Sequence, residues 1–138
     1  MLSVLEAALV LGFVSGLRVF TAPAALYLVR GGVAGILLGI VALGEYVVDA
    51  LPQAPARTNP SQVAVRIASG AFVGWTVGAP SGATLGAVAA GVAGAIAGTY
   101  AGYAVRMWGI ARFGAIPAAI GEDIVAIALA ALVVTRFL

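Results

Sequence analysis

Five charged residues stand within long apolar stretches of the sequence, which makes them the first candidates for a functional site. They are Arg18, Glu45, Asp49, Glu122 and Asp123. Arg18 would lie about 20 Å along a helix that begins at Ser3, because each residue adds ~1.5 Å. In a bilayer such a charge costs roughly 2.5–3.5 kcal/mol on insertion scales, so it must face protein, water or a carboxylate. We expect these side chains to form a polar pathway for an ion or a small polar solute.

The acidic residues differ in the chemistry that their spacing allows. Glu45 and Asp49 are four residues apart and share one helical face, so together they could coordinate a cation or relay protons. Glu122 and Asp123 are adjacent, so their side chains point about 100° apart and cannot both face one partner. The alternative interpretation is that Arg18 and one of these carboxylates form a structural ion pair, which can serve fold specificity alone.

Other kinds of chemistry have no support in the sequence. The chain contains no cysteine and no histidine, which removes most zinc sites and thiolate chemistry. No nucleophile, metalloprotease or phosphate-binding motif is present. The net charge of +2 is too small and too dispersed for nucleic-acid binding. We therefore expect no enzyme activity, no metal, no cofactor and no nucleic-acid partner.

The composition indicates how these residues must be held. Of the 138 residues, 63% are hydrophobic and only 9% are charged, whereas a soluble domain has about 25% charged residues. So few charges cannot cover the surface of a water-soluble protein of this length. We expect a single all-α integral membrane domain, a polytopic helix bundle whose partner is the lipid bilayer.

Apolar segments of suitable length predict about five transmembrane helices. Their expected ranges are 3–29, 33–51, 61–79, 82–105 and 115–135. With five crossings, Arg57, Arg66, Arg106 and Arg112 fall on the side of the N-terminus, against Arg30 and Arg136 on the other side. The positive-inside rule then places the N-terminus in the cytoplasm and the C-terminus outside.

Proline and glycine predict two interruptions of these helices near the charged residues. Pro23 should kink the first segment around Phe20 or Thr21, and the Thr21 hydroxyl could bond the freed carbonyls. Pro117 and Gly121 predict an irregular helix beside the second acidic pair. Pro23 could also break the first segment into two half-helices, and residues 107–120 could lie flat at the interface or re-enter the membrane.

Two further residues near the charged positions have bland interpretations. Arg66 could anchor its helix at the membrane boundary or close the loop that carries Asp49. Tyr46 is most simply a belt or packing residue.

Small residues recur at every fourth position in two of the expected helices. The rows are Gly70, Gly74 and Gly78, and Gly82, Gly86, Ala90, Gly94, Gly98 and Gly102. Such small-xxx-small rows let helix backbones approach closely in a membrane. We expect them to pack helices within the bundle and between subunits, with a homodimer as the favoured assembly.

Four short motifs spread over most of the chain resemble one known family. They are GLRVFTAP (16–23), GEYVVDALPQAPART (44–58), RIASGAFVG (66–74) and GEDIVAI (121–127). The combination resembles the small bacterial integral-membrane proteins of the domain of unknown function 4126 family. The resemblance implies a polytopic protein of the bacterial inner membrane, and it brings no established activity, ligand or catalytic residue.

The sequence leaves three hypotheses for the function. The first is a small channel or transporter whose pathway is formed by the five charged residues. The second is a membrane scaffold or accessory subunit that transports nothing and whose buried charges form structural pairs. The third is lipid handling along a lateral groove, which would extend from the bilayer to Arg18.

Overall fold

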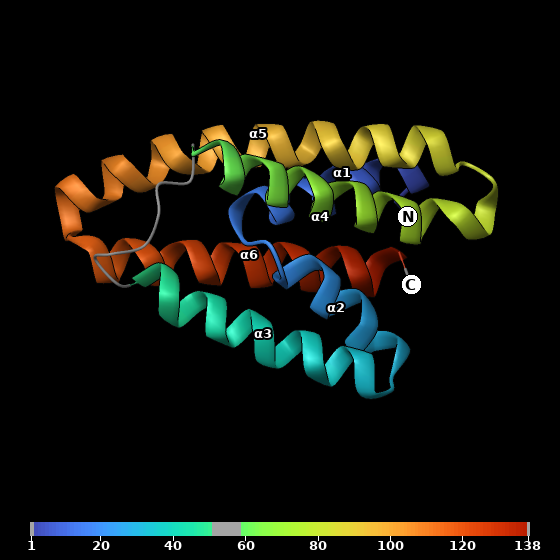
Figure 1. Cartoon of the computed structure of the whole chain (residues 1–138), viewed down its shortest axis with the longest axis horizontal. Helices are drawn as coiled ribbons and strands as arrows, with labels where there is room; N and C mark the ends of the chain where they lie inside the picture. The colour runs from blue at the N-terminus through green and yellow to red at the C-terminus, as the bar shows by residue number, and fades with distance from the viewer. Residues whose placement is uncertain (1, 51–58, 138) are drawn as a thin grey trace.

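The chain folds into a bundle of α-helices, seen in a computed structural model that describes residues 2–50 and 59–137 (Figure 1). These residues form helices, one short 3₁₀ turn (η1) and connecting turns, with no β-strand among them. The elements are α1 (Val4–Leu17), α2 (Thr21–Arg30), α3 (Val33–Ala50), α4 (Pro60–Gly78), η1 (Ala79–Ser81), α5 (Thr84–Phe113) and α6 (Ala115–Phe137). The expected all-α class is confirmed.

Three of these helices are long and apolar enough to cross a membrane. They are α4 extended by η1, α5 and α6. The apolar parts of α1 and α3 in the described residues are shorter. The structure is thus compatible with an integral membrane protein, while the number of five spans stays a prediction.

The segment expected to form one helix over 3–29 forms two short helices that reverse direction. α1 runs toward the middle of the bundle, and α2 returns toward the end from which α1 started (Figure 1). Their 14 and 10 residues give lengths of about 21 and 15 Å, each shorter than the ~30 Å hydrocarbon core. Both chain termini therefore lie at the same end of the bundle (Figure 1), whereas five crossings would separate them.

The two prolines occupy first turns of helices and do not interrupt helix interiors. The first interruption covers residues 18–20, and Pro23 is the third residue of α2. Pro117 is likewise the third residue of α6, which then continues without interruption through Gly121. Proline is tolerated there because the first amides of a helix have no partner within it. The expected irregularity at Pro117 and Gly121 is therefore wrong.

Helix α5 differs at both ends from the expected range 82–105. Gly82 adopts a left-handed conformation with φ 76° in the turn before the helix. The helix continues through the expected boundary segment to Phe113 and ends at Gly114, where φ is 92°. Residues 107–120 consequently form the end of α5, the turn at Gly114 and the start of α6, and their position relative to a membrane stays a prediction.

Helix α1 is the centre of the bundle, packed against α4, α5 and α6. The side chains of Ala7, Ala8, Leu11 and Val14 are completely buried. A helix that is hydrophobic on all sides is suited to such a position. The short α1 is therefore a core element, although it is too short to span a bilayer.

Glycines bring the backbones of α1, α4 and α5 into contact. A methyl group on Gly94 or Gly98 would overlap the carbonyl oxygen of Leu9 or Phe13 in α1. On the α4 side, the close partner of Gly70 is Gly91, a residue outside the every-fourth row. The other glycines of the two rows have different neighbours. Gly74 and Gly78 of α4 lie against Ala87 of α5, whereas Gly86 lies against the side chain of Leu5 alone. Gly102 is buried.

The contact at Gly98 predicts a selective effect of one added methyl group. Gly98→Ala should lower the free energy of unfolding by about 1–3 kcal/mol, because the methyl group meets rigid backbone. Gly44→Ala is the matched control, since the space around Gly44 is open and alanine favours a helix by up to ~1 kcal/mol. Thermal unfolding in a mild detergent measures both. Equal stabilities of the two variants would contradict the contact.

Candidate functional site

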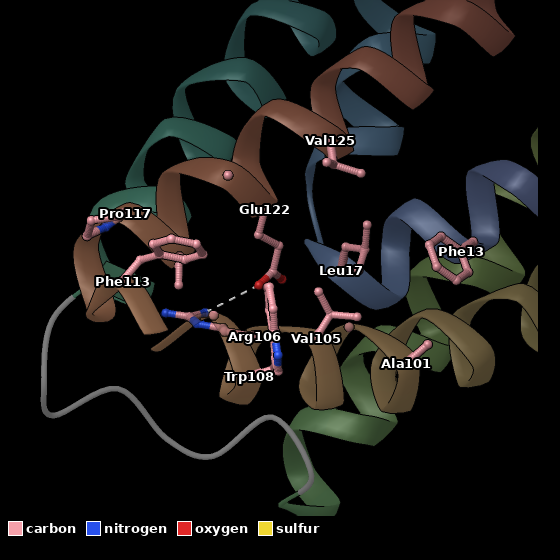
Figure 2. A pocket seen from close by; sticks show the side chains of 14 residues that line it. Phe13, Leu17, Ala101, Val105, Arg106, Trp108, Phe113, Pro117, Glu122 and Val125 are labelled. Carbon is pink, nitrogen blue, oxygen red and sulfur yellow. Dashed lines mark ion pairs between the residues drawn. The ribbon is translucent and has the colours of Figure 1, made fainter. Parts of the chain in front are cut away.

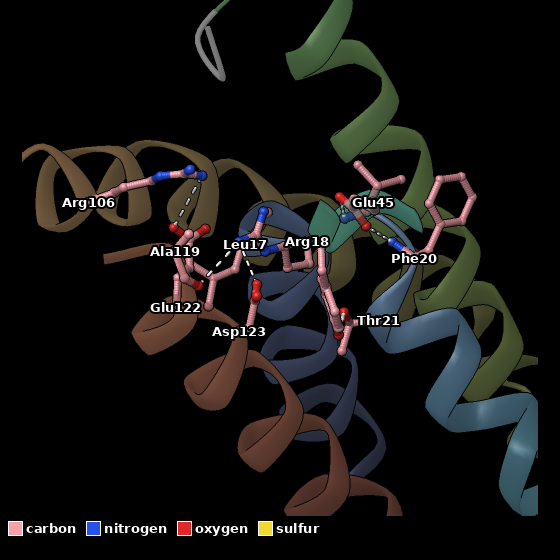
Figure 3. A network of polar contacts seen from close by, with 12 residues as sticks. Leu17, Arg18, Phe20, Thr21, Glu45, Arg106, Ala119, Glu122 and Asp123 are labelled. Atoms are coloured by element: carbon pink, nitrogen blue, oxygen red, sulfur yellow. Dashed lines mark hydrogen bonds and ion pairs between the residues drawn. The ribbon is translucent and has the colours of Figure 1, made fainter. Parts of the chain in front are cut away.

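The interruption between α1 and α2 is the point at which the charged residues converge. α1 ends at Leu17, and Arg18 is extended with φ −142° and ψ 125°. α2 begins at Thr21 after two further residues outside the helices. Such an interruption leaves carbonyls of α1 and amides of α2 without helical partners. Side chains from other helices bond several of these groups (Figure 3).

Glu45 of α3 accepts hydrogen bonds from the backbone at the start of α2. Its Oε2 accepts from the amide of Val19 at 2.7 Å, and its Oε1 accepts from the amide of Phe20 at 3.0 Å. Both carboxylate oxygens are therefore engaged by the backbone. A negative charge is also favourable at a helix N-terminus because it complements the helix dipole.

Arg66 of α4 bonds the other side of the interruption. Its Nη1 donates to the carbonyl oxygens of Gly16 at 2.8 Å and Leu17 at 3.0 Å. The side chain is buried, and its positive charge complements the C-terminal end of α1. On the same helix, the Ser69 hydroxyl donates to the carbonyl oxygen of Val19 at 2.6 Å. Side chains of α3 and α4 therefore form hydrogen bonds with the backbone on both sides of the interruption.

Arg18 extends from the interruption toward α6. Its Nη2 lies 2.5 Å from Oδ1 of Asp123 and donates a longer bond of 3.4 Å to the carbonyl oxygen of Ala119. Its guanidinium lies 5.5 Å from the centre of the Tyr46 ring. The side chain is completely buried. An ion pair in such surroundings is costly to separate, because each charge would remain without compensation.

The two adjacent acidic residues of α6 face different partners, as their 100° separation requires. Asp123 pairs with Arg18, whereas Oε2 of Glu122 lies 3.9 Å from Nη1 of Arg106 in α5 (Figure 3). Both side chains of the second pair are largely buried. α6 therefore links the interrupted helix to α5 through consecutive residues.

These charges are grouped around the interruption and α6, through the contacts described above. The C-terminal ends of α3 and α5 and the N-terminal ends of α4 and α6 lie toward the same end of the molecule, although α4 begins further inward than α5 ends (Figure 1). Counted along its own helix at ~1.5 Å per residue, each of these charges on α3, α4, α5 and α6 lies roughly 8–12 Å from the end of that helix. We call this set the polar layer: Arg18, Glu45, Arg66, Arg106, Glu122 and Asp123.

Two of the expected site residues, Thr21 and Asp49, are not seen in the contacts expected for them. The Thr21 hydroxyl forms a short hydrogen bond with the Tyr46 hydroxyl, and no bond from it to the α1 carbonyls is recorded in the part of the chain that is described. The backbone of Asp49 belongs to α3, but its side chain lies outside the described residues. A cation site formed by Glu45 and Asp49 therefore stays a prediction.

An apolar groove reaches the polar layer from the side of the bundle. It has a volume of about 530 Å³ and lies between α1, α5 and α6 (Figure 2). Its walls include Leu17, Val105, Trp108 and Val125. Glu122, together with its partner arginine, lies at its inner wall. A second apolar cavity of about 600 Å³ lies between α2, α3 and α6.

The described residues hold no cluster of acidic side chains that could bind a metal ion. Comparison of the chain with family models, curated proteins and solved structures finds no match. Function must therefore be argued from the polar layer and from the groove beside it.

Sequence reasoning missed three members of the site. Arg66 was expected either to anchor the chain at the boundary or to close the loop that carries Asp49. Tyr46 was interpreted as a belt or packing residue, and Ser69 was not considered. In the structure Ser69 bonds the carbonyl oxygen of Val19, and Tyr46 bonds the Thr21 hydroxyl. The available signal was the presence of Ser69 among apolar residues, three positions after Arg66 and so close to it on the helix.

The bonds from Arg66 to α1 predict a large effect on stability. Arg66→Met should lower the free energy of unfolding by about 1–3 kcal/mol, because two buried carbonyls lose their donor. Arg136→Met provides a matched control, since Arg136 is exposed near the end of α6. Thermal unfolding of both variants in detergent gives the comparison. A stability loss no greater than that of the control would show that the α1 carbonyls do not depend on Arg66.

Proposed function

We propose that the protein is a small membrane channel or transporter for an ion or a small polar solute. The observation that carries this proposal is the turn between two short helices, α1 and α2, which lies among the charged side chains of the polar layer. Interrupted backbone at membrane depth is tolerated only where protein covers it or where it lines a water-filled cavity. Many transporters place their ion and solute sites at the ends of such half-helices.

The position of α3 suggests how this site could open. Glu45 belongs to α3, which packs mainly against α2 and makes fewer contacts with α6. A small displacement of α3 would remove the carboxylate from the amides of Val19 and Phe20. Those amides would then face a solute, and the Arg18–Asp123 pair would lie beside it. We propose Arg18, Glu45, Glu122 and Asp123 as pathway residues, with Asp49 as a further candidate.

A membrane scaffold or accessory subunit is the second candidate function. The observation that favours it is the pairing of charges within the described residues: Arg18 with Asp123, and Arg106 with Glu122. Such pairs can fix one arrangement of the helices without any transport. The two functions differ in what happens when a pair is replaced by apolar residues of similar size.

Location, orientation and assembly belong to the same proposal. The family resemblance favours the bacterial inner membrane, and the small size of one subunit favours a homodimer. For orientation, Arg66, Arg106 and Arg112 lie toward the end of the bundle that is opposite both termini (Figure 1). Because of these arginines, the positive-inside rule favours both termini outside. The cytoplasmic N-terminus expected from the sequence rested on five crossings, which would place the two termini on opposite sides of the membrane.

Transport should depend on the charges of the polar layer. Purified protein in proteoliposomes should give selective flux in a screen of monovalent cations, protons and small anions. Glu45→Gln and Arg18→Gln should each reduce that flux by at least about tenfold, because a buried charge pathway loses a group that faces the solute. Arg136→Gln, at an exposed position, should leave it unchanged.

A double replacement separates the two candidate functions. Arg18→Leu combined with Asp123→Leu removes both charges of one buried pair and should leave the protein folded. A transporter loses its flux in this variant, whereas a scaffold keeps its assembly and stability. Absence of flux for every solute, with folded wild-type protein, would contradict the transport proposal.

The orientation can be tested by labelling, because the chain has no native cysteine. Ser81→Cys lies at the same end as the termini, and Ser61→Cys lies at the opposite end (Figure 1). A membrane-impermeant maleimide applied to spheroplasts should label the first variant, and it should label the second only after permeabilisation. The reverse pattern would restore a cytoplasmic N-terminus.

A further inference from the structure

The lateral groove between α1, α5 and α6 has features that the transport proposal does not use. It is lined by apolar side chains for most of its length, and several of them, including Trp108 and Phe113, are more than half exposed (Figure 2). It therefore opens toward whatever surrounds the bundle. In a membrane, the surroundings at this face are lipid.

The length of the groove fits one lipid chain. Its α5 wall extends from Ala101 to Phe113, which is about 18 Å at the helical rise of ~1.5 Å per residue. One leaflet of the hydrocarbon core is about half of ~30 Å. The groove begins close to the end of the bundle and runs inward by roughly the depth of a leaflet. Its volume of about 530 Å³ also lies within the roughly 300–1,000 Å³ typical of ligand pockets.

A positive charge marks the outer end of the groove. Arg112 follows Trp108 by four residues and so lies on the same face of α5, one turn nearer the helix end. Its guanidinium lies 5.2 Å from the centre of the Trp108 ring, and this ring forms part of the groove wall. Arg112 is exposed, whereas Arg106 deeper in the groove is paired with Glu122. An exposed arginine beside an indole near a membrane surface is suited to a negatively charged headgroup.

We propose that this groove binds one acyl chain of an anionic phospholipid, with the headgroup phosphate held by Arg112. The apolar walls take the chain, and the inner end of the chain reaches the Arg106–Glu122 pair of the polar layer. Charge complementarity selects an anionic lipid over a zwitterionic one, because Arg112 is the charge that the described residues place beside the outer end of the groove. Bound lipid would contact α1, α5 and α6 together and would cover the side of the polar layer.

One glycine allows the groove to be filled without disturbing the fold. Gly121 lines the groove, and a Cβ atom added there meets no atom within 4 Å. Gly121→Leu therefore occupies the space of the chain and also favours the helix. Gly44→Leu on α3 is the matched control, because its surroundings are equally open but lie outside the groove.

The test measures quenching of Trp108 by lipids with brominated acyl chains, in a Trp75→Phe background that leaves one indole. Brominated phosphatidylglycerol should quench Trp108 more strongly than brominated phosphatidylcholine at equal mole fraction in mixed vesicles. Arg112→Gln should reduce this preference by about fivefold, the factor expected for one arginine near an anionic headgroup. Gly121→Leu should abolish the preference, and Gly44→Leu should retain it.

Three results would overturn the proposal. Equal quenching by the two lipids would indicate contact with the bulk bilayer only. A preference that survives Gly121→Leu would place the lipid outside the groove. A preference that is lost equally in Gly44→Leu would reflect a general change in the bundle. The experiment requires no transport activity, so its failure is distinguishable from failure of the transport proposal.

Discussion

Backbone groups at the interruption between Leu17 and Thr21 need hydrogen-bond partners in the middle of an apolar bundle, and the polar layer supplies them. Each unsatisfied group would cost several kcal/mol in lipid. Glu45, Arg66 and Ser69 bond these groups from α3 and α4. The charges of these side chains also agree in sign with the helix ends that they meet. The same few residues therefore stabilise the local backbone and fix which helices surround it.

Close packing of α1 is the second condition for this arrangement. Glycines on α1, α4 and α5 allow the three backbones to touch, as the contacts of Gly98 and Gly91 show. With larger residues the helices would stand further apart, and the Arg66 side chain would no longer reach the carbonyl oxygens of Gly16 and Leu17. Packing by small residues and bonding by charged residues thus depend on each other. This coupling explains why the smallest and the most polar residues of the chain occur in the same helices.

Much of the helix pattern could be predicted from the sequence, because apolar segments separated by glycine and proline mark helices well. The boundaries of α3 and α4 lie within one residue of expectation. Pro23 indicated that the apolar run over 3–29 could be broken into two half-helices, but hydropathy does not show in which direction the second one runs. The kink that Pro23 indicated around Phe20 or Thr21 lies close to the observed interruption at residues 18–20, but nothing in the sequence indicated that α2 reverses direction there.

The candidate site was predicted in its residue types and only partly in its contacts. Arg18 and Asp123 were both expected among the buried charges, but their pairing depends on how α6 passes α1. The role of Arg66 could not be inferred, since its partners are backbone carbonyls that only the fold brings near. Gly91 was missed for a similar reason: it lies outside the every-fourth row, and only the fold places it against Gly12 of α1 and Gly70 of α4.

The order of synthesis gives the central position of α1 a further consequence. Arg18 is synthesised well before Arg66 and Asp123, which surround the interruption in the folded protein. Synthesis adds roughly 5–20 residues per second, so the delay is a matter of seconds. For part of that time Glu45 of α3 is present, but Arg66 and Ser69 of α4 and Asp123 of α6 are not, and lipid does not supply hydrogen-bond partners. In a membrane, α1 and α2 would therefore reach their final place only when α4, α5 and α6 have been made.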